Sequence, residues 1–240
     1  MSATEASPRL QARMAAGGYL LYLLLGLTGE YLVNAKLIVE GDPAVTANHL
    51  LAHASGFRLG FAMDILMVVS FLVVTLAYYT IFKPVNPRLS ALAAWFSLTG
   101  CGLQALSGLF HLAPLAIVQG GPYLDVFRVE QRQALALLSL ELCAEIFNTA
   151  FIFFAFYFIL LGSLILKSTF LPRVLGILLV ISGTVWLTFL SPPLADRCSA
   201  YLPIGALGMV ALTLWMLLKG VHLQRWLEQR DGVATETGRR

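Results

Sequence analysis

The chain has 240 residues, of which 58% are hydrophobic and only 12% are charged. A soluble domain carries about 25% charged residues, so lipid must replace water over much of this surface. The formal net charge of +3 is too small and too dispersed to indicate a nucleic-acid-binding protein. The cysteines form neither a CxxC motif nor a Cys/His cluster, and we expect no redox chemistry from them.

Six apolar stretches are each long enough to cross a bilayer, which takes about 20 residues. They lie at residues 17–39, 57–82, 88–117, 132–166, 172–191 and 200–221. Backbone groups inside lipid must be satisfied within their own segment, so these stretches predict helices. The fold class is therefore all-α, a polytopic membrane helix bundle with six transmembrane helices.

Three further segments complete the predicted organisation. Residues 1–16 precede the six-span domain of residues 17–222, and residues 223–240 form a polar tail. Asp42-Pro43 is typical of an N-cap followed by a first-turn proline, and it predicts a short helix over residues 43–55 on the outer membrane surface.

Most lysines and arginines fall on the side of the membrane that holds both termini, so the positive-inside rule predicts that both termini are cytoplasmic (N-in/C-in). The basic and apolar N-terminal pattern also resembles a signal peptide with a cleavage site at residues 33–35. We prefer an uncleaved first span, because Glu30 and Tyr31 do not suit the segment before such a site.

Ionisable and amide side chains recur inside the first four predicted spans, toward their outer halves. Residues spaced three or four apart lie on one helix face, which predicts a polar stripe on each of the first, third and fourth spans. The candidate site residues are Glu30, Asn34, Arg58, Asp64, Gln104, His111, Glu141, Glu145 and Asn148. We expect these side chains to form an outward-facing pocket, because charges inside a membrane are costly and usually functional. The alternative is that they are interhelical pairs that only stabilise packing.

A weaker hypothesis makes His111, Glu141 and Glu145 a metal site. His49 and His53 are also four residues apart, but a zinc site needs three or four ligands and no third is nearby in the sequence. No HExxH, GxSxG or GxxxxGK[ST] motif occurs, which favours a non-enzymatic protein and predicts no cofactor.

The first functional hypothesis is a small transporter, or a binder of a lipid or other apolar ligand, that uses the outward-facing pocket. The alternatives are an intramembrane metal-dependent hydrolase and an accessory subunit of a membrane complex. In each case the bilayer is the expected partner, and a lipid or small molecule is the expected ligand.

Several segments resemble a bacterial family of unknown function, DUF4386, over about residues 15–222. The resemblance rests on Arg58-Leu59-Gly60-Phe61 leading to Asp64, Lys83-Pro84-Val85-Asn86, Phe170-Leu171-Pro172-Arg173-Val174-Leu175-Gly176, and Leu214-Trp215 through Lys219-Gly220-Val221. It implies an inner-membrane protein with about six spans and no assigned activity. Family members often have an arginine and a glutamate where this chain has Ser97 and Met209, so only the neighbourhood of Arg58 and Asp64 is carried over.

Overall fold

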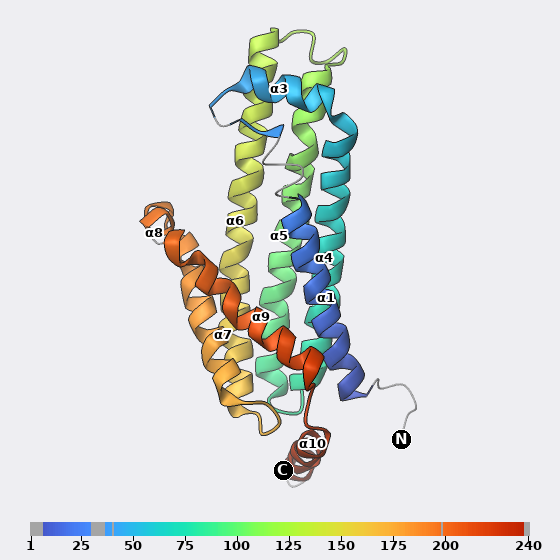
Figure 1. Cartoon of the computed structure of the whole chain (residues 1–240), viewed down its shortest axis with the longest axis vertical. Helices are drawn as coiled ribbons and strands as arrows, with labels where there is room; N and C mark the ends of the chain where they lie inside the picture. Colours follow the sequence, from blue (N-terminus) through green and yellow to red (C-terminus); the bar gives the residue numbers. More distant parts are fainter. Residues whose placement is uncertain (1–6, 30–36, 40, 198, 238–240) are drawn as a thin grey trace. The chain divides into compact units, whose positions relative to one another are not determined.

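The computed structural model describes residues 7–29, 37–39, 41–197 and 199–237. Every regular element in this part of the chain is helical, which confirms the all-α fold class (Figure 1). The α-helices are α1 (Pro8–Gly29), α3 (Pro43–Ala52), α4 (Ala54–Phe82), α5 (Pro87–Gln119), α6 (Val129–Lys167), α7 (Arg173–Trp186), α8 (Pro192–Arg197), α9 (Leu202–Leu218) and α10 (Leu223–Thr237). Two 3₁₀ helices, η2 (Leu187–Leu190) and η3 (Ser199–Tyr201), flank α8.

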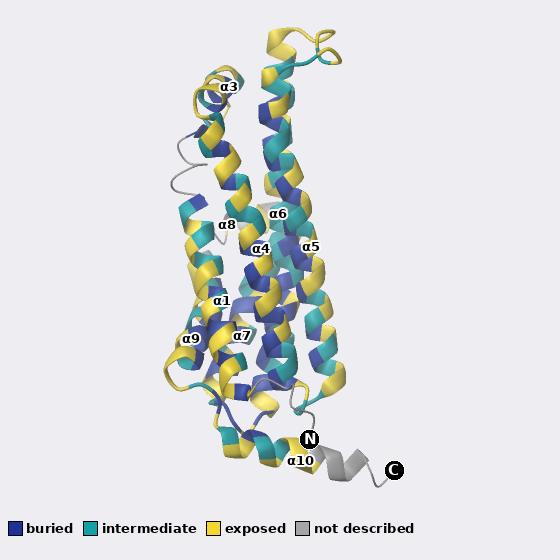
Figure 2. Ribbon diagram, turned by 90° about the vertical axis from the view of Figure 1, so that its right-hand side faces the viewer, coloured by how far each residue is buried: buried dark blue, intermediate teal, exposed yellow. Residues whose placement is uncertain are grey.

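Within the described residues, five helical segments are long and apolar enough to cross a bilayer: α1, α4, α5, α6, and α7 continued through η2. A sixth span is obtained if α9 and α10 are counted together, although the chain bends by 106° between them. Exposed and buried residues alternate along these helices (Figure 2). The exposed residues include large apolar side chains such as Leu76, Trp95 and Leu109. Lipid is the solvent that suits such a surface.

Local sequence accounts for where several helices begin and end. The Asp42 carboxylate accepts hydrogen bonds from the backbone N–H groups of Ala44 and Val45 at 3.1 and 3.0 Å, so α3 begins at Pro43 as the pattern predicts. Helix α1 begins earlier than the predicted first span, at Pro8, and therefore includes two basic residues in its first turns.

The chain divides into two compact units, and α1, α4, α5 and α6 each contribute residues to both. Unit 1 comprises residues 1–20, 70–100 and 149–240, and unit 2 comprises residues 21–69 and 101–148.

Glycine permits close helix packing in unit 1, where α7 and α9 lie side by side (Figure 1). A Cβ atom on Gly162 of α6 would lie 2.6 Å from the carbonyl oxygen of Gly176 on α7. On α9, the N–H of Gly208 donates to the Ser182 hydroxyl of α7 at 3.0 Å. Close backbone approach through small residues is how helices associate in membranes, where no hydrophobic effect drives them together.

Helix α10 occupies residues that the sequence assigned to a polar tail. The Trp226 indole is buried and its Nε1 donates to the carbonyl oxygen of Ile81 at the end of α4, at 2.9 Å. The Gln229 side chain accepts from the N–H and hydroxyl of Thr169, both at 3.1 Å, and donates to the carbonyl oxygen of Lys167 at 3.3 Å. These contacts fix α10 within unit 1.

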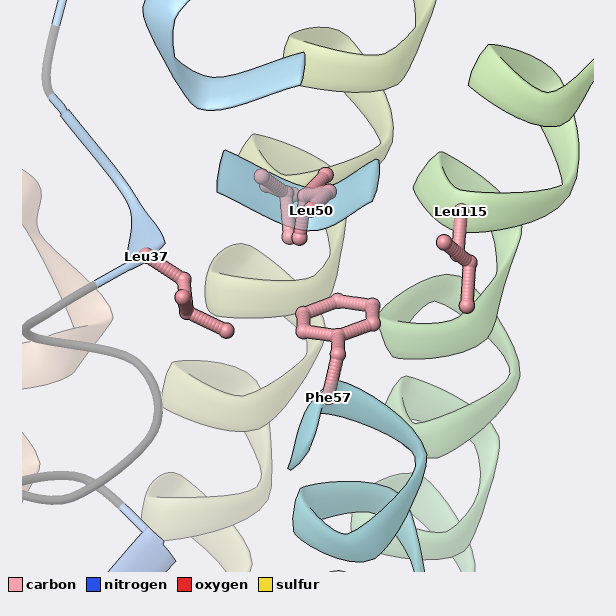
Figure 3. Close-up of a cluster of buried hydrophobic side chains, with 5 residues drawn as sticks. Leu37, Leu50, Phe57 and Leu115 are labelled. Carbon is pink, nitrogen blue, oxygen red and sulfur yellow. The ribbon is translucent and has the colours of Figure 1, made fainter. Parts of the chain in front are cut away.

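A buried hydrophobic cluster closes one end of unit 2. It comprises Leu37, Leu50 of α3, Phe57 of α4, Leu115 of α5 and Leu140 of α6. In Figure 3 the Phe57 ring lies among the leucine side chains that are labelled around it. The cluster packs α3 against α4, α5 and α6, and it encloses one face of the neighbouring His111 ring through Phe57.

Candidate functional site

An ionisable pair joins α4 to α5 inside unit 2. His111 Nδ1 lies 3.0 Å from Asp64 Oδ2, and the two side chains are 6% and 31% exposed. The Phe57 ring stacks on the imidazole, with ring centroids 4.4 Å apart and planes inclined by 27°. Phe57 and Asp64 are seven residues apart on α4, two helical turns, so both face the same neighbour.

The pairing involves one of the two histidine ring nitrogens, Nδ1. An ionised carboxylate only accepts hydrogen bonds, so Asp64 fixes the proton of a neutral His111 on Nδ1 and leaves Nε2 as an acceptor. His111 Nε2 is buried and has no hydrogen-bond partner among the described residues. A buried polar atom without a partner costs about 1–3 kcal/mol, so this atom is suited to meet a hydrogen-bond donor beyond the described residues.

A second polar contact lies on the same face of α5. Gln104 is seven residues before His111, and its side-chain Nε2 donates to the Tyr22 hydroxyl of α1 at 3.0 Å. Its Oε1 atom is buried and, among the described residues, has no partner. Between these two residues, Ser107 is buried and donates to the Gln104 carbonyl oxygen at 2.8 Å.

Helix α6 adds a thiol to the group. Cys143 forms a side-chain hydrogen bond with Ser107 and interacts electrostatically with Asp64. Tyr22 also interacts electrostatically with Asp64. Four helices of unit 2 thus supply one connected set of polar groups, which we call the polar cluster. Its members are Tyr22, Asp64, Gln104, Ser107, His111 and Cys143.

The predicted site residues separate into three groups. The structure brings together Asp64, Gln104 and His111. It leaves others at the surface or partly buried: Arg58, Glu141 and Glu145 are exposed and Asn148 is partly buried. The remaining two, Glu30 and Asn34, lie outside the described residues. The outward-facing pocket as a whole stays a prediction.

The described part of the structure gives no support to the metal hypothesis. In the part of the chain that the structure describes, no three His, Cys, Asp or Glu side chains are grouped so as to hold a metal ion. His111 pairs with Asp64, whereas Glu141 and Glu145 are exposed on α6. His53 Nδ1 lies 3.2 Å from the backbone carbonyl oxygen of His49, a contact within the helix terminus.

Two members of the polar cluster, Tyr22 and Cys143, and the adjacent Phe57 were not selected from the sequence. Tyr22 is eight residues before Glu30, two steps of four along the face where the first polar stripe was expected, so its spacing contained a usable signal. Phe57 and Cys143 offered none, because an aromatic residue and a thiol inside apolar segments are typical of ordinary packing.

Several apolar helices long enough to cross a bilayer, together with an ionisable pair within two of them, define a multi-pass integral membrane protein. The sequence model of DUF4386, described as a domain of unknown function, matches residues 14–220. The chain therefore belongs to the DUF4386 family, which confirms the resemblance seen in its sequence. No curated protein and no solved structure compared with the chain matches it.

Proposed function

We propose that this protein is a small transporter or ligand binder of the inner membrane, and that the polar cluster is its binding site. The observation that carries the proposal is the buried Nε2 atom of His111, which lacks a partner among the described residues although Asp64 orients the ring. An oriented imidazole with one ring nitrogen left over is a typical binding group, and intramembrane ionisable residues are by default functional candidates.

The chemistry of the cluster indicates which ligand it would receive. The Oε1 atom of Gln104 accepts hydrogen bonds, as does His111 Nε2 in the tautomer that Asp64 favours, and both lack partners in the described chain. Asp64 adds a negative charge beside them. Acceptors with a nearby carboxylate suit a small molecule that donates hydrogen bonds. A molecule that carries both a primary ammonium group and a hydroxyl group would fit best.

The spacing of the acceptors determines how many of them one ligand molecule can contact. Gln104 and His111 are seven residues apart on α5, which corresponds to about 10 Å along the helix axis at 1.5 Å per residue. A compact amino alcohol would therefore contact one acceptor at a time. An extended amine would be needed to reach both.

Thermal unfolding of the purified protein with ethanolamine or tetramethylammonium tests the proposal. Ethanolamine donates hydrogen bonds, whereas tetramethylammonium carries the same charge without a donor. A bound ligand at about 100 times its Kd stabilises the folded state by about 2.7 kcal/mol. We expect ethanolamine, and not tetramethylammonium, to raise the Tm of the wild-type protein.

Two variants test whether the Tm shift arises at the polar cluster. His111→Phe keeps an aromatic ring against Phe57 and removes the acceptor, so it should abolish the Tm shift. Glu141→Gln removes an exposed carboxylate outside the polar cluster and should leave the shift unchanged. An equal Tm rise in His111→Phe, or an equal response to both compounds, would show that the polar cluster is not the donor-binding site.

A further inference from the structure

A recess separate from the polar cluster lies in unit 1, where the α6–α7 connection meets the bend between α9 and α10. Its volume is about 320 Å³. The residues that line it are Thr169, Phe170, Leu171, Pro172, Trp215, Lys219, Gly220, His222 and Arg225. We call it the basic recess, because all the ionisable side chains in this lining are Lys, His or Arg.

The cationic groups of the basic recess are accessible and only partly engaged. Lys219, His222 and Arg225 are all exposed. The Lys219 ammonium lies 4.5 Å from the centroid of the Trp215 ring, and Arg225 Nη1 donates to the Thr169 carbonyl oxygen at 3.4 Å. Arginine has five N–H donors and lysine three, so both retain donors for an anion.

The fold holds these groups at the end of a candidate span. Gly220 adopts a φ of 66°, which L side chains rarely adopt, and its N–H donates to the Trp215 carbonyl oxygen at 3.0 Å. The chain then turns by 106° into α10. The hydrogen bonds of Gln229 to Thr169 and Lys167 hold α10 against the α6–α7 connection, so both walls of the recess are fixed.

We propose that the basic recess binds the headgroup of an anionic phospholipid. Lys219 and Arg225 supply donors and positive charge for the phosphate, while Phe170, Leu171 and Trp215 supply apolar surface for the adjoining glycerol and acyl chain. The recess lies where α6 and α9 end and α7 begins, which places it at the membrane–water boundary. The positive-inside pattern assigns this boundary to the cytoplasmic leaflet, where basic recesses between helices recruit anionic lipids.

The shape of α10 favours a lipid over a soluble anion. The helix is nearly perpendicular to α9 and buries Trp226 on one side, while Arg225, Glu228, Arg230 and Asp231 are exposed. A helix with one apolar side and one charged side is typical of a segment that lies in the membrane interface.

Native mass spectrometry in neutral detergent tests the proposal with phosphatidylglycerol, phosphatidylcholine and inorganic phosphate as probes. Each basic group near an anionic lipid surface strengthens binding about fivefold. The double variant K219Q/R225Q should therefore bind phosphatidylglycerol about 30-fold more weakly than the wild type. Arg230→Gln removes a charge from the same helix outside the recess lining and should have no such effect.

The remaining probes distinguish the sources of the anion. Wild-type protein that retains phosphatidylcholine as tightly as phosphatidylglycerol would overturn the proposal. So would inorganic phosphate that displaces phosphatidylglycerol at equal concentration, because the recess would then be a soluble-anion site. If R230Q weakened phosphatidylglycerol binding as much as K219Q/R225Q does, the loss of binding would depend on net charge alone. That outcome would also overturn the proposal.

A fluorescence measurement on the wild-type sequence decides the question if the double variant does not fold. Brominated acyl chains quench tryptophans that they contact, and Trp215 lines the recess. We expect brominated phosphatidylglycerol to quench more strongly than brominated phosphatidylcholine, and the difference to disappear in Trp215→Phe. Equal quenching by both lipids would contradict the proposal. The polar cluster is not involved in either experiment.

Discussion

Replacing Gly162 with alanine should destabilise the contact between α6 and α7. The added Cβ would lie 2.6 Å from the Gly176 carbonyl oxygen and 2.9 Å from Val180 Cγ2, whereas ordinary contacts begin at 3.4 Å. The two backbones must therefore separate by about 0.8 Å, the difference between 3.4 and 2.6 Å. A gap of that size removes a quarter to a half of the attraction between the atoms it separates.

The destabilisation of Gly162→Ala is best measured against the same substitution at a glycine where the added Cβ would contact no other atom. A Cβ on Gly17, inside α1, would have no atom within 4 Å. Gly→Ala raises helix propensity by about 1 kcal/mol in both variants, and overpacking costs about 1–3 kcal/mol in Gly162→Ala alone. Gly162→Ala should therefore unfold with a free energy about 1–3 kcal/mol lower than that of Gly17→Ala, as measured by SDS titration followed by circular dichroism. Equal stability of the two variants would refute the close packing of α6 on α7.

Trp226→Phe should lower the free energy of unfolding by about 1 kcal/mol, because it removes the hydrogen bond to Ile81 while keeping an aromatic ring. It should also speed proteolysis of α10, and unchanged cleavage would contradict the anchoring of that helix. Ser182→Ala should cost about 0.6 kcal/mol in thermal unfolding, the average for interhelical hydrogen bonds in membranes, since its hydroxyl accepts from Gly208. A variant that retains only Cys101 should react with a thiol reagent after unfolding and not before, because Cys101 is buried; rapid labelling of folded protein would argue against the position of α5.

Length and local pattern were sufficient to predict the long apolar helices and the start of α3. A run of about 20 apolar residues defines a span by physical necessity, and Asp42-Pro43 identifies a helix start from adjacent residues alone. Helix α10 was missed for the opposite reason. Its sequence is polar, and what fixes it comes from distant parts of the chain, through Trp226 with Ile81 and Gln229 with Thr169.

The candidate site shows the same limit of sequence reasoning. Helical spacing placed Gln104 and His111 on one face of α5, and the structure joins His111 to Asp64 of α4. Spacing also put Glu141 and Glu145 on one face of α6, but that face is exposed. Periodicity determines which residues share a helix face, and only tertiary packing decides where the face points.

The central claim is that Asp64 orients His111 and leaves Nε2 available as an acceptor. Solid-state ¹⁵N NMR of histidine-labelled protein in bilayers tests it directly, with the signal assigned by its loss in His111→Phe. We expect the proton on Nδ1 and an unprotonated Nε2 in the wild type, and a changed tautomer population in Asp64→Leu, which removes the acceptor. A His111 spectrum that is identical in Asp64→Leu, or an Nε2 atom hydrogen-bonded to another residue of this chain, would contradict the account.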